Sequence, residues 1–301
     1  MNSAIVTGVG GPAGKALTGQ LTDAGWRVVG ADMAALAPPY DALLDEFHQI
    51  PAAAHPSFLP VLAQLVARSG AQLCIPTVQE ELPVLASAAS CLDVAVVIAP
   101  TDAVARAQDK LTTSWTLRQA GVAVPDFCAA EDIAGQSSGW WGRGGRFVVK
   151  PRFSRGGRGV QVVEEAGDLG EIAAQSPGGI VQQFAPGTEY SPQVYRAPSG
   201  GAIEVIVLEK TALKEGLVGN AAAVLVVDGP SVADVARLAR EAVLAMGLTG
   251  PVDLDIRRLA DGTPVVLEIN ARFGANSASA PSLLHRVLAD YAPRSAREGV
   301  A

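Results

Sequence analysis

The first hundred residues alternate between short apolar segments and segments with helical periodicity, and this alternation limits the folds open to the chain. Strands that alternate with helices pack as a parallel sheet with helices on both faces. We therefore expect an α/β domain at the amino-terminal end. The expected strands are 4–7, 27–31, 72–75 and 95–98, and the expected helices are 15–24, 57–69 and one after Glu80.

The pattern changes from about residue 101, where a helix at 111–120 is followed by a loop at 125–145 and then mainly by strands. This second part of the chain predicts an α+β arrangement. Its expected strands are 147–150, 160–163, 180–184, 189–195, 203–208, 221–227, 252–257 and 264–269, and its expected helices are 168–175 and 232–246.

Two of the late strands carry acidic side chains. Asp255 lies on an alternating apolar segment, and Glu268 and Asn270 follow on the next strand, two positions apart. Residues two apart on a strand point to the same face. Mg²⁺ prefers oxygen ligands and usually takes one or two carboxylates together with nucleotide phosphates. The spacing therefore predicts a Mg²⁺ site made by Asp255, Glu268 and Asn270.

Two alternatives stay open for these acidic residues. Asp253 lies on the same strand face as Asp255, so one could be the ligand and the other its supporting partner. We prefer Asp255 because of its spacing to Glu268. The later strand could also be an edge strand whose polar face points to water.

A phosphate-binding segment is expected earlier in the chain. Lys150 closes one expected strand, and a glycine-rich segment with Ser154, Gly156, Gly157 and Gly159 leads into the next. Glycines let backbone N–H groups approach phosphate oxygens, and the lysine adds a positive charge. The segment therefore predicts phosphate binding, with a plain hairpin turn as the alternative.

Composition and charge exclude several classes of function. With 49% apolar and 18% charged residues, the chain has the composition of a folded globular protein. A net charge of −7 argues against nucleic-acid binding, which needs a basic surface. The apolar segments are far shorter than the about 20 residues that span a bilayer, and no charged segment precedes an apolar core at the start. We expect a cytoplasmic protein that binds neither nucleic acid nor membranes.

The cysteines and histidines form no recognisable motif. The three cysteines, Cys74, Cys91 and Cys128, lack CxxC spacing, so neither a disulfide framework nor a zinc site is indicated. None of the three histidines lies beside a serine or cysteine in a nucleophile motif. Catalysis through a serine or cysteine triad therefore has little support.

A second glycine-rich segment, at 7–14, follows the first expected strand, and Asp32 ends the next strand. This pattern is typical of dinucleotide-binding turns and suggests an NAD(P)-dependent oxidoreductase of the short-chain type. Such enzymes need a YxxxK pair, which the chain lacks. We therefore interpret the segment as a tight strand-to-helix turn that could still contact part of a substrate. The tyrosines, none with a lysine four residues later, are Tyr40, Tyr190, Tyr195 and Tyr291.

With the lysine, the glycine loop and the carboxylate pair in this order, the chain resembles the ATP-grasp superfamily. Within it, the chain looks like the branch of carboxylate–amine ligases and carbamoyl-phosphate synthetase large-subunit modules. The resemblance covers nearly the whole length. It implies a Rossmann-like pre-ATP-grasp domain at 1–105 and a two-subdomain ATP-grasp fold at 106–301. The first subdomain would be 106–180, and the second, with the metal site, 181–292.

The resemblance also implies the nucleotide contacts. Lys110 and Lys150 match the two nucleotide lysines of the family, and Glu189 in a GxE pattern matches its ribose-binding glutamate. Many relatives carry glutamate where Gln182 stands, and an amide can still pair with the adenine amino group. The implied ATP-binding set is Lys110, Lys150, Ser154, Gly156, Gly157, Gly159, Gln182, Gln183, Phe184, Ala185 and Glu189.

The family pattern places Asp255, Glu268 and Asn270 as metal ligands and Arg272 as a phosphate contact. Arg272, Lys150 and Lys110 would then be the catalytic cations, and the cofactors would be ATP and two Mg²⁺ ions, with Mn²⁺ as a substitute. The family's more frequent Asn-Pro-Arg is Asn-Ala-Arg here. The segment 209–215 lacks the arginines often found there, so the acceptor pocket of relatives cannot be transferred.

The resemblance implies an ATP-dependent ligase that joins a small-molecule carboxylate to an amine through an acyl phosphate, on amino-acid-like substrates. A homodimer is compatible with the sequence. Alternatives are the NAD(P)-dependent oxidoreductase, a carbamoyl-phosphate-type bicarbonate-activating enzyme and a nucleotide-binding module without turnover. Further substrate contacts are suggested at Glu80, Lys214, Ser277 and Ser279.

Several polar residues also have simpler interpretations. Lys110 could be an exposed residue at a helix start. Lys210 and Lys214 are one helical turn apart and could form a solvated face or contact phosphate or substrate. Glu80 and Glu81 could simply cap the following helix.

Overall fold

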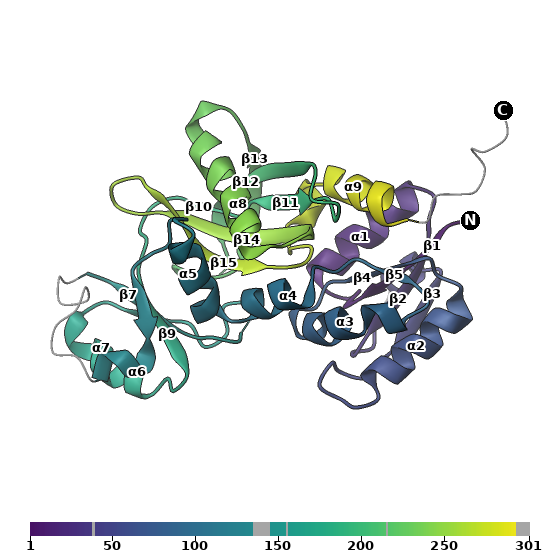
Figure 1. The fold of residues 1–301 in the computed structure, drawn as a ribbon, viewed down its shortest axis with the longest axis horizontal. Helices are drawn as coiled ribbons and strands as arrows, with labels where there is room; N and C mark the ends of the chain where they lie inside the picture. Colours follow the sequence, from purple (N-terminus) through teal and green to yellow (C-terminus); the bar gives the residue numbers. More distant parts are fainter. Residues whose placement is uncertain (38–39, 135–144, 155, 215, 293–301) are drawn as a thin grey trace.

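The computed structural model describes residues 1–37, 40–134, 145–154, 156–214 and 216–292. Three sheets build the described part of the molecule. Figure 1 shows a parallel sheet and a four-stranded sheet at opposite ends, with a six-stranded sheet between them.

The amino-terminal sheet is parallel throughout, with the strand order β3-β2-β1-β4-β5. Pro12 starts α1 at a position where the missing N–H costs no hydrogen bond, and Gly70 ends α2 with a left-handed backbone. The predicted α/β sheet is confirmed, with β3 as an additional edge strand. Its elements are β1 (Ser3–Thr7), α1 (Pro12–Asp23), β2 (Arg27–Asp32), η1 (Tyr40–Leu43), β3 (Glu46–Gln49), α2 (Phe58–Ser69), β4 (Leu73–Pro76), η2 (Gln79–Glu81), α3 (Leu82–Ala88), η3 (Ala89–Cys91) and β5 (Ala95–Val96).

Two helices lead into a four-stranded antiparallel sheet with the order β6-β9-β7-β8. The loop predicted at 125–145 is wrong in part, because it contains β6 and α6; residues 135–144 lie outside the described part. A strand as short as β6 shows no periodicity, and its pairing with β9 defines it. The elements are α4 (Thr101–Gln108), α5 (Lys110–Gln119), β6 (Phe127–Ala129), α6 (Ala130–Ala134), β7 (Phe147–Pro151), β8 (Gln161–Val163), α7 (Ala166–Ala174) and β9 (Gly179–Gln183).

The six-stranded sheet is antiparallel, and β14 and β15 form its end next to the four-stranded sheet. The single strand predicted at 189–195 is wrong, because Pro192 has no N–H to donate and the segment divides into β10 and β11. The elements are β10 (Glu189–Tyr190), β11 (Gln193–Arg196), β12 (Ile203–Leu213), β13 (Ala221–Val227), η5 (Pro230–Val232), α8 (Ala233–Met246), β14 (Gly250–Arg258), β15 (Pro264–Asn270), η6 (Ser277–Ser279) and α9 (Ser282–Tyr291).

The helical-turn interpretation of Lys210 and Lys214 is also wrong. Strand β12 runs on to Leu213, well past the predicted end at 208, because it pairs with β13 along most of its length. Lys210 therefore projects from a strand and not from a helix.

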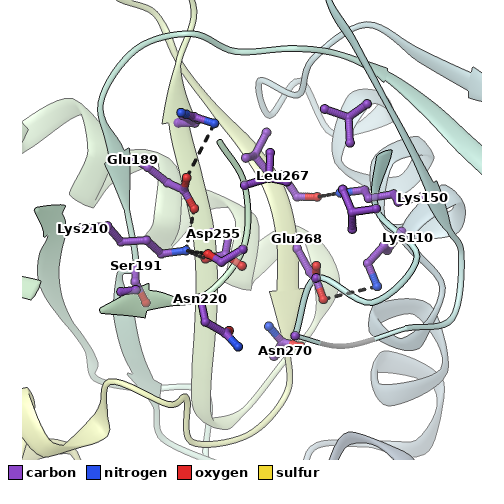
Figure 2. Close-up of a pocket in the computed structure, with 18 of the residues that line it drawn as sticks. Lys110, Lys150, Glu189, Ser191, Lys210, Asn220, Asp255, Leu267, Glu268 and Asn270 are labelled. Atoms are coloured by element: carbon purple, nitrogen blue, oxygen red, sulfur yellow. Dashed lines mark hydrogen bonds and ion pairs between the residues drawn. The ribbon is translucent and has the colours of Figure 1, made fainter. Parts of the chain in front are cut away.

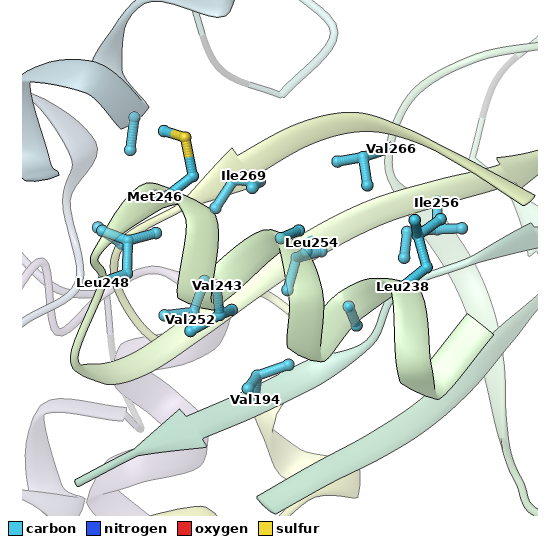
Figure 3. Packing of buried hydrophobic residues seen from close by; sticks show 14 of the residues in the cluster. Val194, Leu238, Val243, Met246, Leu248, Val252, Leu254, Ile256, Val266 and Ile269 are labelled. Atoms are coloured by element: carbon cyan, nitrogen blue, oxygen red, sulfur yellow. The ribbon is translucent and has the colours of Figure 1, made fainter. Parts of the chain in front are cut away.

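Helix α8 covers one face of this sheet and orients the opposite face. Leu238, Val243 and Met246 of α8 pack with Leu254 and Ile269 in one buried cluster (Figure 3). Because side chains alternate along a strand, the acidic residues between these apolar positions point away from α8. The core thus sets which face of β14 and β15 carries the polar side chains.

Helix α9 returns the end of the chain to the amino-terminal part. Its residues Leu283 and Leu284 are buried in one cluster with Leu17 of α1 (Figure 1). Within the described residues, the longest apolar helices are too short to cross a bilayer.

Candidate active site

A cleft between the four-stranded and six-stranded sheets collects most of the predicted site residues (Figure 2). They come from α5, β7, the glycine loop, β9, β10, β14 and the end of β15. The predicted residues that line it are Lys110, Lys150, Ser154, Gly156, Gly157, Gln182, Gln183, Phe184, Ala185, Glu189, Asp255, Glu268, Asn270 and Arg272.

The acidic residues lie opposite each other across two neighbouring strands. Asp255 of β14 pairs in register with Glu268 of β15, and Asp253 pairs with Asn270. Among the described residues, no three His, Cys, Asp or Glu side chains form a ready metal site. The predicted set, two carboxylates and an amide, offers the oxygen ligands that Mg²⁺ takes when phosphates supply the others. The donor chemistry therefore fits a nucleotide-bound metal.

Lys110 is buried at the start of α5 and does not point into solvent. Its side chain is 5% exposed and its Nζ donates a hydrogen bond to the Ser154 carbonyl oxygen at 2.7 Å. The same Nζ lies 3.3 Å from Glu268 Oε1. The alternative of an exposed helix-end residue is therefore wrong.

Asp109 fixes the helix start that carries this lysine. Its carboxylate accepts hydrogen bonds from the Leu111 N–H and from Arg152. Burial alone would raise the pKa of Asp109, but these bonds and the Thr112 hydroxyl outweigh it and lower the pKa to about 2. The carboxylate thus stays charged and caps α5.

Lys150 is buried near the end of β7 and lines the cleft. Its Nζ donates to the Leu267 carbonyl oxygen at 3.2 Å (Figure 2). Burial lowers the pKa of Lys150 to about 8, with Glu268 opposing and Lys110 adding to the decrease. An anion in the cleft would favour the charged form of this amine.

The glycine loop has the backbone that only glycine adopts easily. Gly156, Gly157 and Gly159 have φ of 62°, 75° and 72°. The first two line the cleft. Gly159 does not, and a Cβ there would lie 2.9 Å from Pro151 Cγ, so this glycine shapes the loop.

Lys210 joins two carboxylates that were predicted to serve different partners. Its Nζ lies 2.5 Å from Glu189 Oε1 and 2.7 Å from Asp255 Oδ1 (Figure 2). Burial alone would lower the pKa of Lys210, but both carboxylates outweigh it and raise the pKa. Burial also raises the pKa of Glu189. No sequence spacing predicts this contact, because the three residues lie on three strands far apart in the chain.

Asp253 anchors a buried polar network beside Asp255 and Glu268. Its Oδ1 accepts from Gln193 Nε2 at 2.6 Å and from the Ser191 hydroxyl at 3.1 Å. Its Oδ2 lies 3.2 Å from Arg272 Nη1 and 3.4 Å from Asn270 Nδ2. Burial raises the pKa of Asp253. With both oxygens engaged, Asp253 suits a supporting role, and Asp255 suits the ligand role.

Four other predicted residues lie outside this cleft lining. The Ser277 hydroxyl donates to the Gly274 carbonyl oxygen, and Ser279 lies in the same short helix η6. Lys214 follows β12, and Glu80 lines a second cavity beside the amino-terminal glycine turn. Their substrate roles stay predictions.

The amino-terminal glycine turn uses its own amides internally. The N–H groups of Val9 and Gly11 donate to the carbonyl oxygens of Ala31 and Gly8, and the Gly10 N–H donates to Asp32 Oδ2 at 2.9 Å. Dinucleotide sites of this kind present such amides to a pyrophosphate. This arrangement weighs against the NAD(P) hypothesis.

Comparisons with known proteins identify the family of the chain. The family model for the ATP-grasp domain matches residues 107–276, more than half of the chain. No curated protein sequence matches.

Several solved structures share the fold. L-amino acid ligase from Bacillus licheniformis aligns with a TM-score of 0.73 and 20% identity over 92% of this chain and 69% of that one. N5-carboxyaminoimidazole synthetase from Staphylococcus aureus, complexed with ADP, aligns with a TM-score of 0.71 and 18% identity over 97% of this chain and 78% of that one. Biotin carboxylase from Campylobacter jejuni aligns with a TM-score of 0.72 and 16% identity over 97% of this chain and 72% of that one. The predicted fold class is confirmed, and the chain belongs to the ATP-grasp family.

Proposed function

We propose that this protein is an ATP- and Mg²⁺-dependent carboxylate–amine ligase that forms an amide or peptide bond. One observation carries the proposal: the cross-strand pair Asp255 and Glu268 faces the same cleft as Lys110, Lys150 and Arg272. Hard oxygen ligands beside three cations are what a metal-bound triphosphate requires.

The reaction would proceed in two steps. A substrate carboxylate oxygen attacks the γ-phosphorus of ATP, and the bond to the β–γ bridging oxygen breaks, which gives an acyl phosphate and ADP. The amine nitrogen then attacks the acyl carbon, loses a proton, and releases phosphate. Neither step needs a protein nucleophile, which agrees with the lack of a triad motif.

The chain's residues would act by position and charge. Lys110, Lys150 and Arg272 would neutralise the phosphate oxygens as charge moves from the γ-phosphate to ADP. A divalent metal held by Asp255, Glu268 and Asn270 would supply further charge stabilisation when bound. Glu189 would accept hydrogen bonds from the ribose hydroxyls, and the segment 182–185 would bind adenine.

An amino-acid-like substrate pair is the finer part of the proposal. It is supported by the structural likeness to an L-amino acid ligase. Bicarbonate activation is the second candidate, because the N5-carboxyaminoimidazole synthetase and biotin carboxylase folds are nearly as similar. The segment 209–215 lacks arginine, so the acceptor pocket of relatives does not choose between the two candidates.

An ADP-release screen tests the proposal. Amino acids, small carboxylates and bicarbonate are offered alone and in pairs with amines, each with ATP and Mg²⁺. The proposal expects ADP and phosphate only when a carboxylate and an amine are both present. ATP binding without release for every pair would indicate a nucleotide-binding module, and a thermal shift with NADPH but not with ATP–Mg²⁺ would favour the oxidoreductase.

A further inference from the structure

The Lys210 side chain is buried among acceptors in the cleft. Its side chain is 4% exposed, and all three of its N–H donors have acceptors: Glu189 at 2.5 Å, Asp255 at 2.7 Å and the Gly219 carbonyl oxygen at 3.3 Å (Figure 2). An ammonium group has no further donor to offer. Its position is therefore defined by two carboxylates and one backbone oxygen.

The contact to Asp255 conflicts with metal binding. A ligating carboxylate oxygen lies about 2.0–2.1 Å from Mg²⁺, and an ammonium 2.7 Å from Asp255 would then lie within a few ångströms of a divalent ion. Like charges at such distances repel by several kcal/mol even at an effective dielectric constant of about 20. A metal on Asp255 would therefore be repelled by the Lys210 ammonium for as long as the ammonium stays at this distance.

We propose that Lys210 is an exchangeable counter-ion: it neutralises Asp255 in the metal-free protein, and a divalent metal displaces it. Glu189 and Gly219 keep the displaced ammonium inside the cleft. This proposal rests on the metal ligands of the proposed function, but not on any substrate or product. Lys210 then competes with the metal for Asp255, so removal of the lysine charge strengthens metal binding.

Binding of Mn²⁺ without nucleotide, measured by electron paramagnetic resonance, tests the sign of this effect. The Lys210→Met variant is expected to bind Mn²⁺ at least about tenfold more tightly than the unchanged protein, since a nearby like charge is removed. A lysine with a purely structural role would weaken metal binding when removed. Lys214→Met is the matched control, because Lys214 lies just beyond the same strand and outside the cleft lining. The Mn²⁺ affinity of this variant is expected to equal that of the unchanged protein.

Lys210→Met could also fail to fold, because it removes the lysine charge from the buried Glu189 carboxylate and from the partly exposed Asp255 carboxylate. Nuclear magnetic resonance of the unchanged protein covers this case. The chain has five lysines, so Nζ labelling gives five ammonium signals that single Lys→Arg variants assign. Mg²⁺ is expected to shift the Lys210 signal and to leave Lys15 and Lys214 unmoved. The five are Lys15, Lys110, Lys150, Lys210 and Lys214.

Two results would overturn the proposal. One is a Lys210 signal that stays in place while Mg²⁺ saturates the protein, as followed by calorimetry. The other is a folded Lys210→Met variant that binds Mn²⁺ no more tightly than the unchanged protein. The proposed ligase activity is judged separately by ADP release, so metal exchange without ADP release would leave this inference standing and would count against the ligase alone.

Discussion

Asp255 and Glu268 face each other across β14 and β15 as direct register partners, and the strand pairing becomes irregular immediately after them. The pair is positioned by the core, since Leu254 and Ile269 beside them are buried under α8. Each carboxylate is paired with a lysine, Asp255 with Lys210 and Glu268 with Lys110. In the proposed function, a divalent metal binds between these two carboxylates.

Removal of one metal carboxylate should stop turnover without unfolding the protein. Glu268→Gln keeps the size of the side chain but removes the charge, so ADP release should fall by about 100-fold or more. The melting temperature should change little. Glu241→Gln on the outer face of α8, where Glu241 is about half exposed, is the control and should retain full activity. Equal rates for Glu268→Gln and the unchanged protein would contradict the metal assignment.

Activity should depend on the charge of Lys150. Its pKa of about 8 means that the amine is protonated below this pH and neutral above it. The kcat/KM for ATP, which reports the free enzyme, should therefore fall as pH rises through about 8. In Lys150→Arg the cation persists at high pH, so this fall should disappear even if the overall rate is lower. A profile that is flat to pH 10 in the unchanged protein would argue against a phosphate role.

Gly274 should tolerate no side chain. A Cβ at Gly274 would lie 2.4 Å from Asp253 Cγ, so alanine must displace the carboxylate that contacts Arg272. We expect Gly274→Ala to destabilise the protein by about 1–3 kcal/mol and to lower kcat. Gly170→Ala within α7 meets nothing within 4 Å and should stabilise by up to about 1 kcal/mol. Thermal melts of both variants test these expectations. Equal stability of Gly274→Ala and Gly170→Ala would contradict the packing argument.

Glu189 should discriminate nucleotides by their ribose hydroxyls. If its carboxylate accepts both hydroxyls, the unchanged protein should prefer ATP to 2′,3′-dideoxy-ATP by about tenfold or more in KM, since each bond to a charged group contributes about 1.5–3 kcal/mol. In Glu189→Gln the preference should shrink sharply. Competition measurements with both nucleotides test this, and an undiminished preference in the variant would place the ribose elsewhere.

Local sequence patterns were sufficient for the elements that carry the cleft. Alternating apolar residues located β14 and β15, and the glycine segment after Lys150 located a loop that needs positive φ. A proline and the pairing between strands determined the strand boundaries that the local patterns predicted wrongly. Pro192 divides one predicted strand, and β12 extends to Leu213 because β13 pairs with it.

The missed side-chain contacts are all non-local. Lys210 meets Glu189 and Asp255 only because three strands of one sheet bring them together, and Asp253 meets Gln193 in the same way. A single sequence shows no spacing for such contacts. Charged residues that alternate with apolar ones on several strands could indicate a shared polar face, but not which groups pair on it.

A crystal structure with Mn²⁺ and a non-hydrolysable ATP analogue is the decisive test of metal binding between Asp255 and Glu268, because anomalous scattering locates the metal. We expect Mn²⁺ within about 2.0–2.3 Å of oxygen atoms of Asp255 and Glu268 and of the nucleotide phosphates, with Lys210 withdrawn from Asp255. Metal held elsewhere, or phosphates bound without metal near these two carboxylates, would contradict it.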